Sequence, residues 1–257
     1  MNKQGNLQNK VAIITGGGSG IGKATAIQMA QLGVKVIITG RTASKIQAVA
    51  QEIIETGGIA KAISLDVADH KAVHEMAKMV QQEFGRIDIL INNAGHSSNN
   101  RRLLSITPEE IHAVINTNLI GTMYCAQAVA QAMLEQKSGT IINVSSLAAL
   151  HPSAFSGMAY GPAKAAVINF TEFLNEELKN TGIRATVFIP GEVNTPILNE
   201  RYVPPSQDAR ELMVGVEETA EAICMIASLP QRTNIPKMII RPTFHRDMSG
   251  ETEPMVS

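Results

Sequence analysis

The chain has no excess of charge of either sign, only two cysteines and no long run of apolar residues. Its 22 lysines and arginines balance 23 aspartates and glutamates, so the basic surface that nucleic-acid binding requires is not expected. Cys125 and Cys224 lie far apart without cysteine or histidine neighbours at metal-ligand spacing, which predicts neither a metal site nor a disulfide. The polar segment Met1–Lys10 lacks the apolar core of a signal peptide, and no apolar run reaches the ~18 residues of a membrane helix. These absences predict a cytoplasmic protein that binds neither nucleic acid nor membrane.

Short apolar segments rich in β-branched residues alternate with longer segments of helical periodicity. The expected strands are Val11–Thr15, Val34–Thr39, Ala60–Leu65, Ile87–Ile91, Thr140–Val144, Arg184–Ile189 and Lys237–Arg241. The expected helices are Ile21–Leu32, Ala43–Thr56, Lys71–Phe84, Pro108–Gln136, Ala163–Asn180 and Glu217–Ser228. Strands that are apolar on both faces suit a parallel sheet with helices on each side. The pattern predicts an α/β fold: one doubly wound, Rossmann-type domain over residues 1–257, with a parallel sheet of about seven strands and helices on both faces.

Two segments depart from this alternation. Gly191–Gly215 holds three prolines and no clear periodicity. A long loop in a compact domain usually serves a site, so residues 192–215 are expected to form a lid over the substrate. The polar C-terminal segment, residues 244–257, is expected to be mobile.

A glycine-rich turn, Thr15–Gly22, leads from the first expected strand into the first expected helix. Glycines let a pyrophosphate approach the backbone, and the N-terminus of the helix offers free N–H groups to it. The spacing is GxxxGxG rather than the GxGxxG of the commonest dinucleotide fingerprint, and a loop of this kind can also occur without a ligand. Its place at the first strand-to-helix turn favours a dinucleotide site.

The residues after the second expected strand bear on the choice of dinucleotide. A site that prefers NAD usually has an acidic residue here, which binds the ribose 2′-hydroxyl. This chain has Gly40 and then Arg41 instead. A guanidinium binds a 2′-phosphate through charge-assisted hydrogen bonds, so the sequence favours NADP over NAD. The alternative is that Arg41 is a solvated loop residue.

Tyr160 and Lys164 are spaced so that both side chains lie on one face of a helix, with Pro162 in its first turn. A free tyrosine, with a pKa near 10, is a poor acid or base at neutral pH. A nearby ammonium stabilises the phenolate, so we expect the pKa of Tyr160 to be lowered. An isolated YxxxK pattern is common, and in most proteins it is an exposed helical pair.

Taken together and in this order, the motifs resemble the short-chain dehydrogenase/reductase family, and within it the 3-oxoacyl-carrier-protein reductases. The resemblance spans roughly Lys10 to Thr195. The motifs that carry it are TGGGSGIG at Thr15–Gly22, Asp66-Val67, Asn92-Asn93-Ala94-Gly95, Asn118, Ser145-Ser146, YGPAK at Tyr160–Lys164, and Pro190-Gly191.

The resemblance implies a catalytic role for four residues. Tyr160 exchanges a proton with the substrate oxygen, and Lys164 lowers the tyrosine pKa and binds the nicotinamide ribose. Ser146, rather than Ser145, hydrogen-bonds the substrate oxygen. Asn118 positions a water that links Lys164 to solvent, although it could instead cap a helix Leu119–Gln136.

The resemblance also implies which residues contact the dinucleotide. Asp66 and Val67 meet the adenine, Asn93, Ala94 and Gly95 line the adenosine and ribose side, and Val193 and Thr195 hold the carboxamide. With the turn, Arg41 and the catalytic pair, the expected cofactor-binding set is Gly16, Gly18, Ser19, Gly20, Ile21, Arg41, Asp66, Val67, Asn93, Ala94, Gly95, Tyr160, Lys164, Val193 and Thr195.

The substrate is not fixed by the sequence beyond a small molecule with a carbonyl or alcohol group. Candidate pocket residues from loops at the carboxyl ends of strands are His96, Leu147, His151, Phe155, Met158 and Leu198. Four arginines could attract an anionic substrate or be ordinary surface charges: Arg101, Arg102, Arg201 and Arg210.

Three functions remain open at this point. The first is an NADP-dependent oxidoreductase, acting chiefly as a reductase, and the second is an NAD-linked alcohol dehydrogenase. The third is a nucleotide-sensing protein without turnover, which would be expected to lose Tyr160 or Lys164. Small or apolar residues on two helices also predict a homodimer or homotetramer. These residues are Ala126, Ala128, Ala130, Ala132, Ala166, Val167, Phe170 and Phe173.

Overall fold

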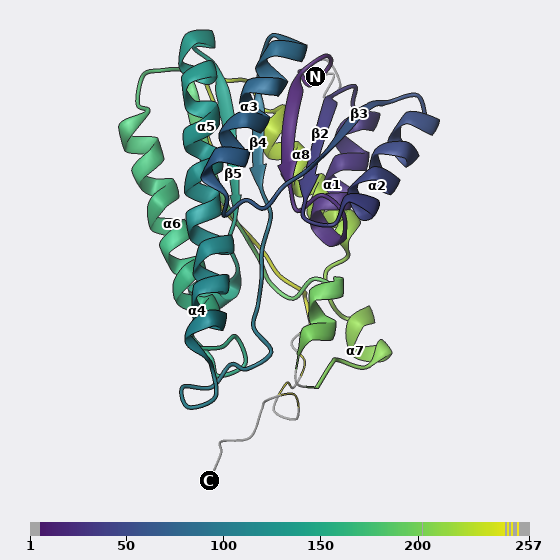
Figure 1. The fold of residues 1–257 in the computed structure, drawn as a ribbon. Helices are drawn as coiled ribbons and strands as arrows, with labels where there is room; N and C mark the ends of the chain where they lie inside the picture. The colour runs from purple at the N-terminus through teal and green to yellow at the C-terminus, as the bar shows by residue number, and fades with distance from the viewer. Residues whose placement is uncertain (1–5, 202, 245, 247, 249–250, 252–257) are drawn as a thin grey trace.

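Seven parallel strands form one sheet covered by helices on both faces (Figure 1). The structure, a computed structural model, describes residues 6–201, 203–244, 246, 248 and 251. The strands are β1 (Val11–Thr15), β2 (Lys35–Gly40), β3 (Ile59–Ser64), β4 (Ile89–Asn92), β5 (Gly139–Val144), β6 (Ile183–Pro190) and β7 (Lys237–Ile240). The helices are α1 (Gly20–Gln31), α2 (Ala43–Glu55), α3 (His70–Phe84), α4 (Pro108–Ile115), α5 (Gly121–Gln136), α6 (Tyr160–Glu177), α7 (Gln207–Glu211) and α8 (Val216–Ser228).

This architecture confirms the predicted fold class. The expected elements match the observed ones to within two residues at each end, apart from α6, which begins and ends three residues earlier. Its early start brings Tyr160 into the helix and puts Pro162 in the first turn, where a missing N–H has no cost.

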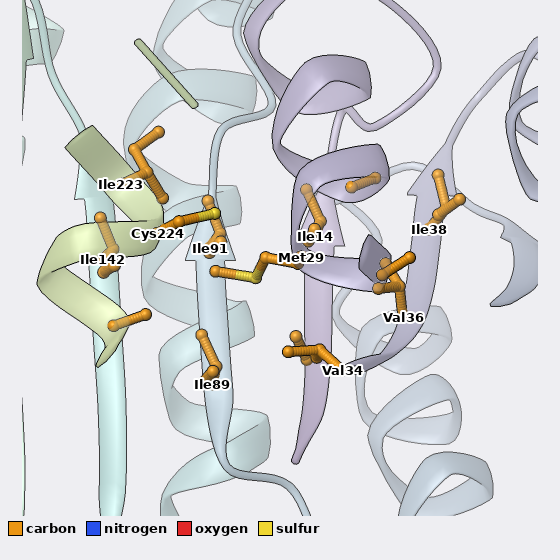
Figure 2. Packing of buried hydrophobic residues seen from close by; sticks show 14 of the residues in the cluster. Ile14, Met29, Val34, Val36, Ile38, Ile89, Ile91, Ile142, Ile223 and Cys224 are labelled. Atoms are coloured by element: carbon orange, nitrogen blue, oxygen red, sulfur yellow. The ribbon is translucent and has the colours of Figure 1, made fainter. Parts of the chain in front are cut away.

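Each face of the sheet packs against its own set of helices. Along β1, Ile14 belongs to the cluster shared with α1, α2 and α8, whereas Ile13 belongs to the cluster under α3, α5 and α6. Figure 2 shows the first cluster, in which Met29 of α1 and Cys224 of α8 meet side chains from neighbouring strands. Because consecutive residues of a strand point to opposite faces, a strand buried on both sides is apolar along most of its length, as β1 is from Val11 to Ile14.

The strand order places the ligand crevice. The sheet runs β3-β2-β1-β4-β5-β6-β7, so the direction of winding reverses between β1 and β4. In open α/β sheets, ligands bind outside the carboxyl ends of the strands at this switch point. The glycine turn follows β1, and Asn93 to Gly95 follow β4, so both lie at the crevice.

The long helix expected over Pro108–Gln136 is interrupted by one π-helical turn, Asn116–Ile120, between α4 and α5. Asn118 lies inside this turn, with right-handed helical residues on both sides. The alternative in which Asn118 caps a helix N-terminus is therefore wrong. π-turns of this kind are frequent at functional sites.

The segment expected to form a lid, residues 192–215, contains a 3₁₀ turn, Pro196–Glu200, then α7. A parallel bridge between Val193 and Val214 joins its two ends. α7 lies beyond the carboxyl edge of the sheet (Figure 1). That this segment moves as a lid stays a prediction. The predicted mobility of residues 244–257 also stays a prediction, because most of these residues lie outside the described part of the chain.

Both cysteines are buried as free thiols. Among the described residues, no group of three or more histidine, cysteine or acidic side chains could hold a metal ion. The same part of the chain contains no helix that is long and apolar enough to span a membrane.

Candidate active site

The glycine turn is held in place by the loop that follows β4. Thr15 Oγ1 accepts hydrogen bonds from the backbone N–H groups of Asn93 and Ala94, both at 3.0 Å. In return, Asn93 Nδ2 donates to the carbonyl oxygens of Thr15 and Gly16, both at 3.1 Å. The amide of Asn93 therefore shapes the turn, in addition to lying at the edge of the cavity described below.

The turn leaves no room for side chains. Gly16 has a φ of +64°, and a Cβ there would lie 2.8 Å from Ala94 Cα. A Cβ on Gly22 would lie 2.4 Å from the carbonyl oxygen of Gly16. Ser19, at the N-cap of α1, makes no side-chain capping hydrogen bond, so it does not satisfy the first N–H groups of the helix. Bare backbone and an open helix N-terminus are what a phosphate group requires.

A cavity of about 590 Å³ opens beside this turn, within the usual size range of small-ligand sites. It is lined by the following predicted site residues: Gly16, Ser19, Gly20, Ile21, Asn93, Gly95, Ser146, Tyr160, Lys164, Val193 and Thr195. The predicted site residues that do not line it are Gly18, Arg41, Asp66, Val67, Ala94 and Asn118.

The residues expected at the adenosine end lie where β2 and β3 finish. Arg41 is exposed, and its side chain makes no hydrogen bond with the described part of the chain. Asp66 Oδ1 accepts a hydrogen bond from the backbone N–H of Ala68 at 2.9 Å. Val67 is buried, and a Cβ on Gly121 would lie 2.5 Å from its Cγ2, so its side chain packs against α5.

The two serines after β5 have different environments. Ser145 is 2% exposed, and its Oγ donates to the backbone carbonyl of Lys164 at 2.8 Å, which fixes α6 to the sheet. Ser146 Oγ accepts a hydrogen bond from the backbone N–H of Ala148 at 3.2 Å and lines the cavity. Both serines line the cavity, but the Oγ of Ser145 is engaged with α6, so Ser146 remains the predicted substrate-binding serine.

Tyr160 and Lys164 lie one helical turn apart at the start of α6, and both line the cavity. Lys164 is 3% exposed, and its Nζ donates to the carbonyl oxygen of Val144 at 2.9 Å. The same nitrogen lies 5.7 Å from the centre of the Tyr160 ring. The ammonium is thus anchored to the sheet beside the tyrosine.

Asn118 turns one unused acceptor towards this pair. Its Nδ2 donates to the carbonyl oxygens of His96 at 2.7 Å and Val114 at 2.8 Å. Its Oδ1 is buried and has no hydrogen-bond partner. A Cβ on Gly95 would lie 3.2 Å from this oxygen and 3.7 Å from Lys164 Nζ, so both polar atoms border the same small space. A water in that space would satisfy both groups.

The pKa values of the pair differ from the expectation. Burial raises the pKa of Tyr160, while a hydrogen bond with Ser146 and the charges of Arg101 and Arg201 act in the opposite direction. Burial also lowers the pKa of Lys164 to about 8. The expected fall in the tyrosine pKa is therefore wrong for this structure, because desolvation outweighs the nearby positive charges.

The cavity lining also contains charged residues, Glu192 and Arg246, that the sequence motifs do not predict. Glu192, directly after Pro190-Gly191, forms ion pairs with Arg201 at 3.0 Å and Arg246 at 2.8 Å. A strand-end position on the carboxyl edge is the one signal that could have identified Glu192. Arg246 lies far along the chain and has no local pattern around it.

Of the other candidates, Leu147, His151, Phe155, Leu198, Arg101 and Arg201 line the cavity. Met158 and Arg102 line a second, more apolar pocket, together with the exposed Leu103 and Leu104. Arg210 instead binds the side chains of Asn194 and Asn199.

Because a buried ammonium destabilises the folded state, we expect Lys164→Met to raise the free energy of unfolding at pH 7, by about 1–2 kcal/mol. The relief from desolvation should exceed the loss of the hydrogen bond to Val144. With a folded-state pKa of about 8 for Lys164 and an unfolded value near 10.4, the unfolded chain binds more protons between these limits. Wild-type stability should therefore rise with pH in this window, and the advantage of the variant should shrink.

Urea unfolding at pH 7 and pH 10 measures the effect. Lys179→Met, a change at an exposed lysine near the end of the same helix, is the matched control and should alter stability little at either pH. A Lys164→Met protein less stable than wild type at pH 7 would contradict the expectation.

Comparison with known proteins agrees with this geometry. The family model described as short chain dehydrogenase matches residues 10–204. An uncharacterized oxidoreductase of Staphylococcus aureus (strain USA300) is 36% identical over 236 residues, covering 92% of this chain and 98% of the relative. A metagenomic short-chain oxidoreductase solved with NADP is 30% identical, with a TM-score of 0.81 over 93% of this chain and all of its own. A serine dehydrogenase complexed with NADP+ is 31% identical, with a TM-score of 0.83 over 92% of this chain and 100% of its own. The chain is an oxidoreductase of the short-chain dehydrogenase/reductase family.

Proposed function

We propose that this protein is an NADP-dependent oxidoreductase of the cytoplasm that interconverts a carbonyl compound and a secondary alcohol, acting chiefly as a reductase. The observation that carries the proposal is that Tyr160, Ser146 and Lys164 line the same cavity as the glycine turn. A proton donor and a dinucleotide cradle thus face one space, which is what hydride transfer to a carbonyl requires.

The dinucleotide, when bound, supplies the hydride. Ser146 Oγ and Tyr160 Oη would bind the carbonyl oxygen of the substrate, and Tyr160 would transfer its proton to that oxygen. Because burial raises the pKa of Tyr160, the hydroxyl holds its proton at neutral pH, which is the form that reduction needs.

After Tyr160 has given its proton to the substrate, Lys164 and Asn118 would supply a new proton to the tyrosine. Lys164, with a pKa of about 8, can exchange a proton near neutral pH. The unpaired Oδ1 of Asn118 borders the same space as Lys164 Nζ, so a water held there would connect the pair to solvent. These two residues position and supply protons, whereas Tyr160 and Ser146 touch the substrate.

The residues present fit NADP. The glycine turn offers bare backbone at the N-terminus of α1, where a pyrophosphate binds. Arg41, with no hydrogen bond to its side chain from the described residues, is available for a 2′-phosphate, and Gly40 puts no carboxylate in its way. Two of the solved relatives hold NADP, which supports the same choice.

Two other functions are less well supported. A nucleotide sensor without turnover has no need of Tyr160 and Lys164 in the cavity. An NAD-linked alcohol dehydrogenase would gain from an acidic residue at Gly40, which is absent. The finer resemblance to 3-oxoacyl-carrier-protein reductases stays a prediction.

Tyr160→Phe should lower kcat by about 10²- to 10⁴-fold, because it removes the proton donor and keeps the ring. The dissociation constant for NADPH should change little. Turnover of a panel of ketones and aldehydes is followed at the nicotinamide absorbance. Tyr124→Phe is the matched control, since Tyr124 packs against His70 away from the cavity. Near-normal turnover of Tyr160→Phe would contradict the role of Tyr160 as proton donor.

Arg41→Ala should weaken NADPH binding by about 10- to 100-fold through the loss of a charge-assisted hydrogen bond, and should leave NADH binding nearly unchanged. Gly40→Asp should shift the preference towards NADH, because a carboxylate repels the 2′-phosphate. A Cβ at Gly40 would lie 3.1 Å from Ile46 Cγ2 and near no other atom, so only the Ile46 side chain has to shift slightly. Titration of both cofactors by fluorescence measures the preference. If wild type binds NADH as tightly as NADPH, Arg41 is a surface residue only.

For the assembly, we extend the proposal to a homodimer formed through α5 and α6, with a tetramer as the larger alternative. Phe173 on α6 is 54% exposed and Leu134 on α5 is 37% exposed. Ala126, Ala128 and Ala132 pack partly against the protein's own core, so these small residues are not all available to a partner. The exposed Phe173 is therefore the stronger indication that a partner subunit covers this face.

Light scattering at micromolar concentration should give at least twice the 27.5 kDa monomer mass. Phe173→Glu should shift the mass towards the monomer, because a carboxylate would be buried in the contact. Ile54→Glu, at an exposed apolar residue of α2 on the opposite face of the sheet, should not. A monomeric wild type would rule the interface out.

A further inference from the structure

Four charged side chains form a closed cluster, and three of them, Glu192, Arg201 and Arg246, line the cavity. Arg246 binds Glu192 through Nε and Nη2, each at 2.8 Å, and also binds Glu251. Arg201 Nη1 binds Glu192 at 3.0 Å and Glu251 at 3.1 Å. Both carboxylates are therefore already paired, and their bonds fix the orientation of the Arg201 guanidinium.

Arg201 lies over the Phe155 ring and uses only part of its hydrogen-bonding capacity within the described residues. Its guanidinium carbon lies 4.0 Å from the centre of the Phe155 ring, and its side chain is 10% exposed. In the described part of the chain, neither Nε nor Nη2 of Arg201 makes a hydrogen bond. Arg201 lines the cavity, and its Nε and Nη2 are the donors that the cluster leaves unused within the described part of the chain. The Nε–Nη2 edge of an arginine is a planar pair of donors that matches a carboxylate.

Two arginines of the cavity lining act on Tyr160. Arg201 acts on the pKa of Tyr160, and so does Arg101, which donates to the carbonyl oxygens of Ser98 and Phe155, both at 3.0 Å. Among the described residues that line the cavity, Glu192 is the only acidic one, against four arginines. Even with Glu251, which pairs with Arg201 and Arg246 from outside the lining, the positive groups around this space outnumber the negative ones, which favours a negatively charged ligand.

We propose that the substrate is an oxo acid or hydroxy acid, and that Arg201 binds its carboxylate through Nε and Nη2. The inference rests on the proposed oxidoreductase function and names its substrate class. In the reduction, the carbonyl carbon accepts a hydride from NADPH and the carbonyl oxygen accepts the Tyr160 proton. The product is the hydroxy acid with NADP+, and the carboxylate is unchanged.

The test compares oxo acids with neutral analogues of similar shape. The 2-, 3- and 4-oxo acids of four or five carbons are assayed with NADPH against their methyl esters, and simple ketones are included. For at least one chain length, wild type should show a kcat/KM for the acid about 10- to 100-fold above that for its ester, because the charge-assisted pair exists only for the acid.

Variants then assign the preference to Arg201. Arg201→Met should reduce the acid-to-ester ratio of kcat/KM by about 10- to 100-fold, chiefly through KM for the acid, and Arg201→Lys should retain part of it. The ratio cancels any general loss of activity or folding. Arg210→Met, on the same segment but outside the cavity lining, is the matched control and should keep the wild-type ratio.

Acid-to-ester ratios of kcat/KM near one in wild type would overturn the inference. So would a wild-type ratio that Arg201→Met leaves unchanged. Turnover of neutral ketones or esters in that case leaves the proposed function standing. No turnover of any carbonyl compound, in either direction and with either cofactor, would overturn the proposed function and this inference with it.

Discussion

The site depends on the two-way hydrogen bonding between Thr15 and Asn93. Thr15 ends β1, and Asn93 follows β4, its neighbour across the point where the winding of the sheet reverses. Thr15 Oγ1 holds the backbone of the β4 loop, and the Asn93 amide holds the carbonyls of the glycine turn. The same loop carries Gly95, whose bare Cα borders Asn118 Oδ1 and Lys164 Nζ. A change in the phosphate cradle would therefore be transmitted to the catalytic pair through only a few residues.

The polar groups proposed to serve the chemistry lower the stability of the folded state. Lys164 is a buried cation whose Nζ has one hydrogen bond, and Asn118 Oδ1 is a buried acceptor with none. Unpaired buried polar groups cost stability, and proteins retain them chiefly where function requires them. The π-turn that holds Asn118 belongs to the same pattern, because an uninterrupted α-helix would aim this side chain differently.

The sequence predicts the elements well and the electrostatics poorly. Strand ends such as Val11–Thr15 follow from local apolar patterning, and the glycine turn follows from a local motif. Ser145 and Ser146 differ only in three dimensions: both line the cavity, but the Oγ of Ser145 donates to the backbone of α6, whereas Ser146 Oγ makes no bond to that helix. The direction of the Tyr160 pKa shift could not be predicted, because it depends on how far burial outweighs charges from distant loops.

If the proposed carboxylate binding holds, those distant charges would link substrate recognition to the acid role of Tyr160. Arg101 follows β4 and Arg201 follows β6, yet both act on the same phenol. A carboxylate bound to Arg201 would offset its charge and so raise the pKa of Tyr160 further above its ordinary value. The tyrosine would hold its proton more firmly before reduction, and the proton would leave only as negative charge develops on the substrate oxygen. Substrate binding and control of proton transfer would then depend on one guanidinium, which is fixed by Glu192, Glu251 and the Phe155 ring.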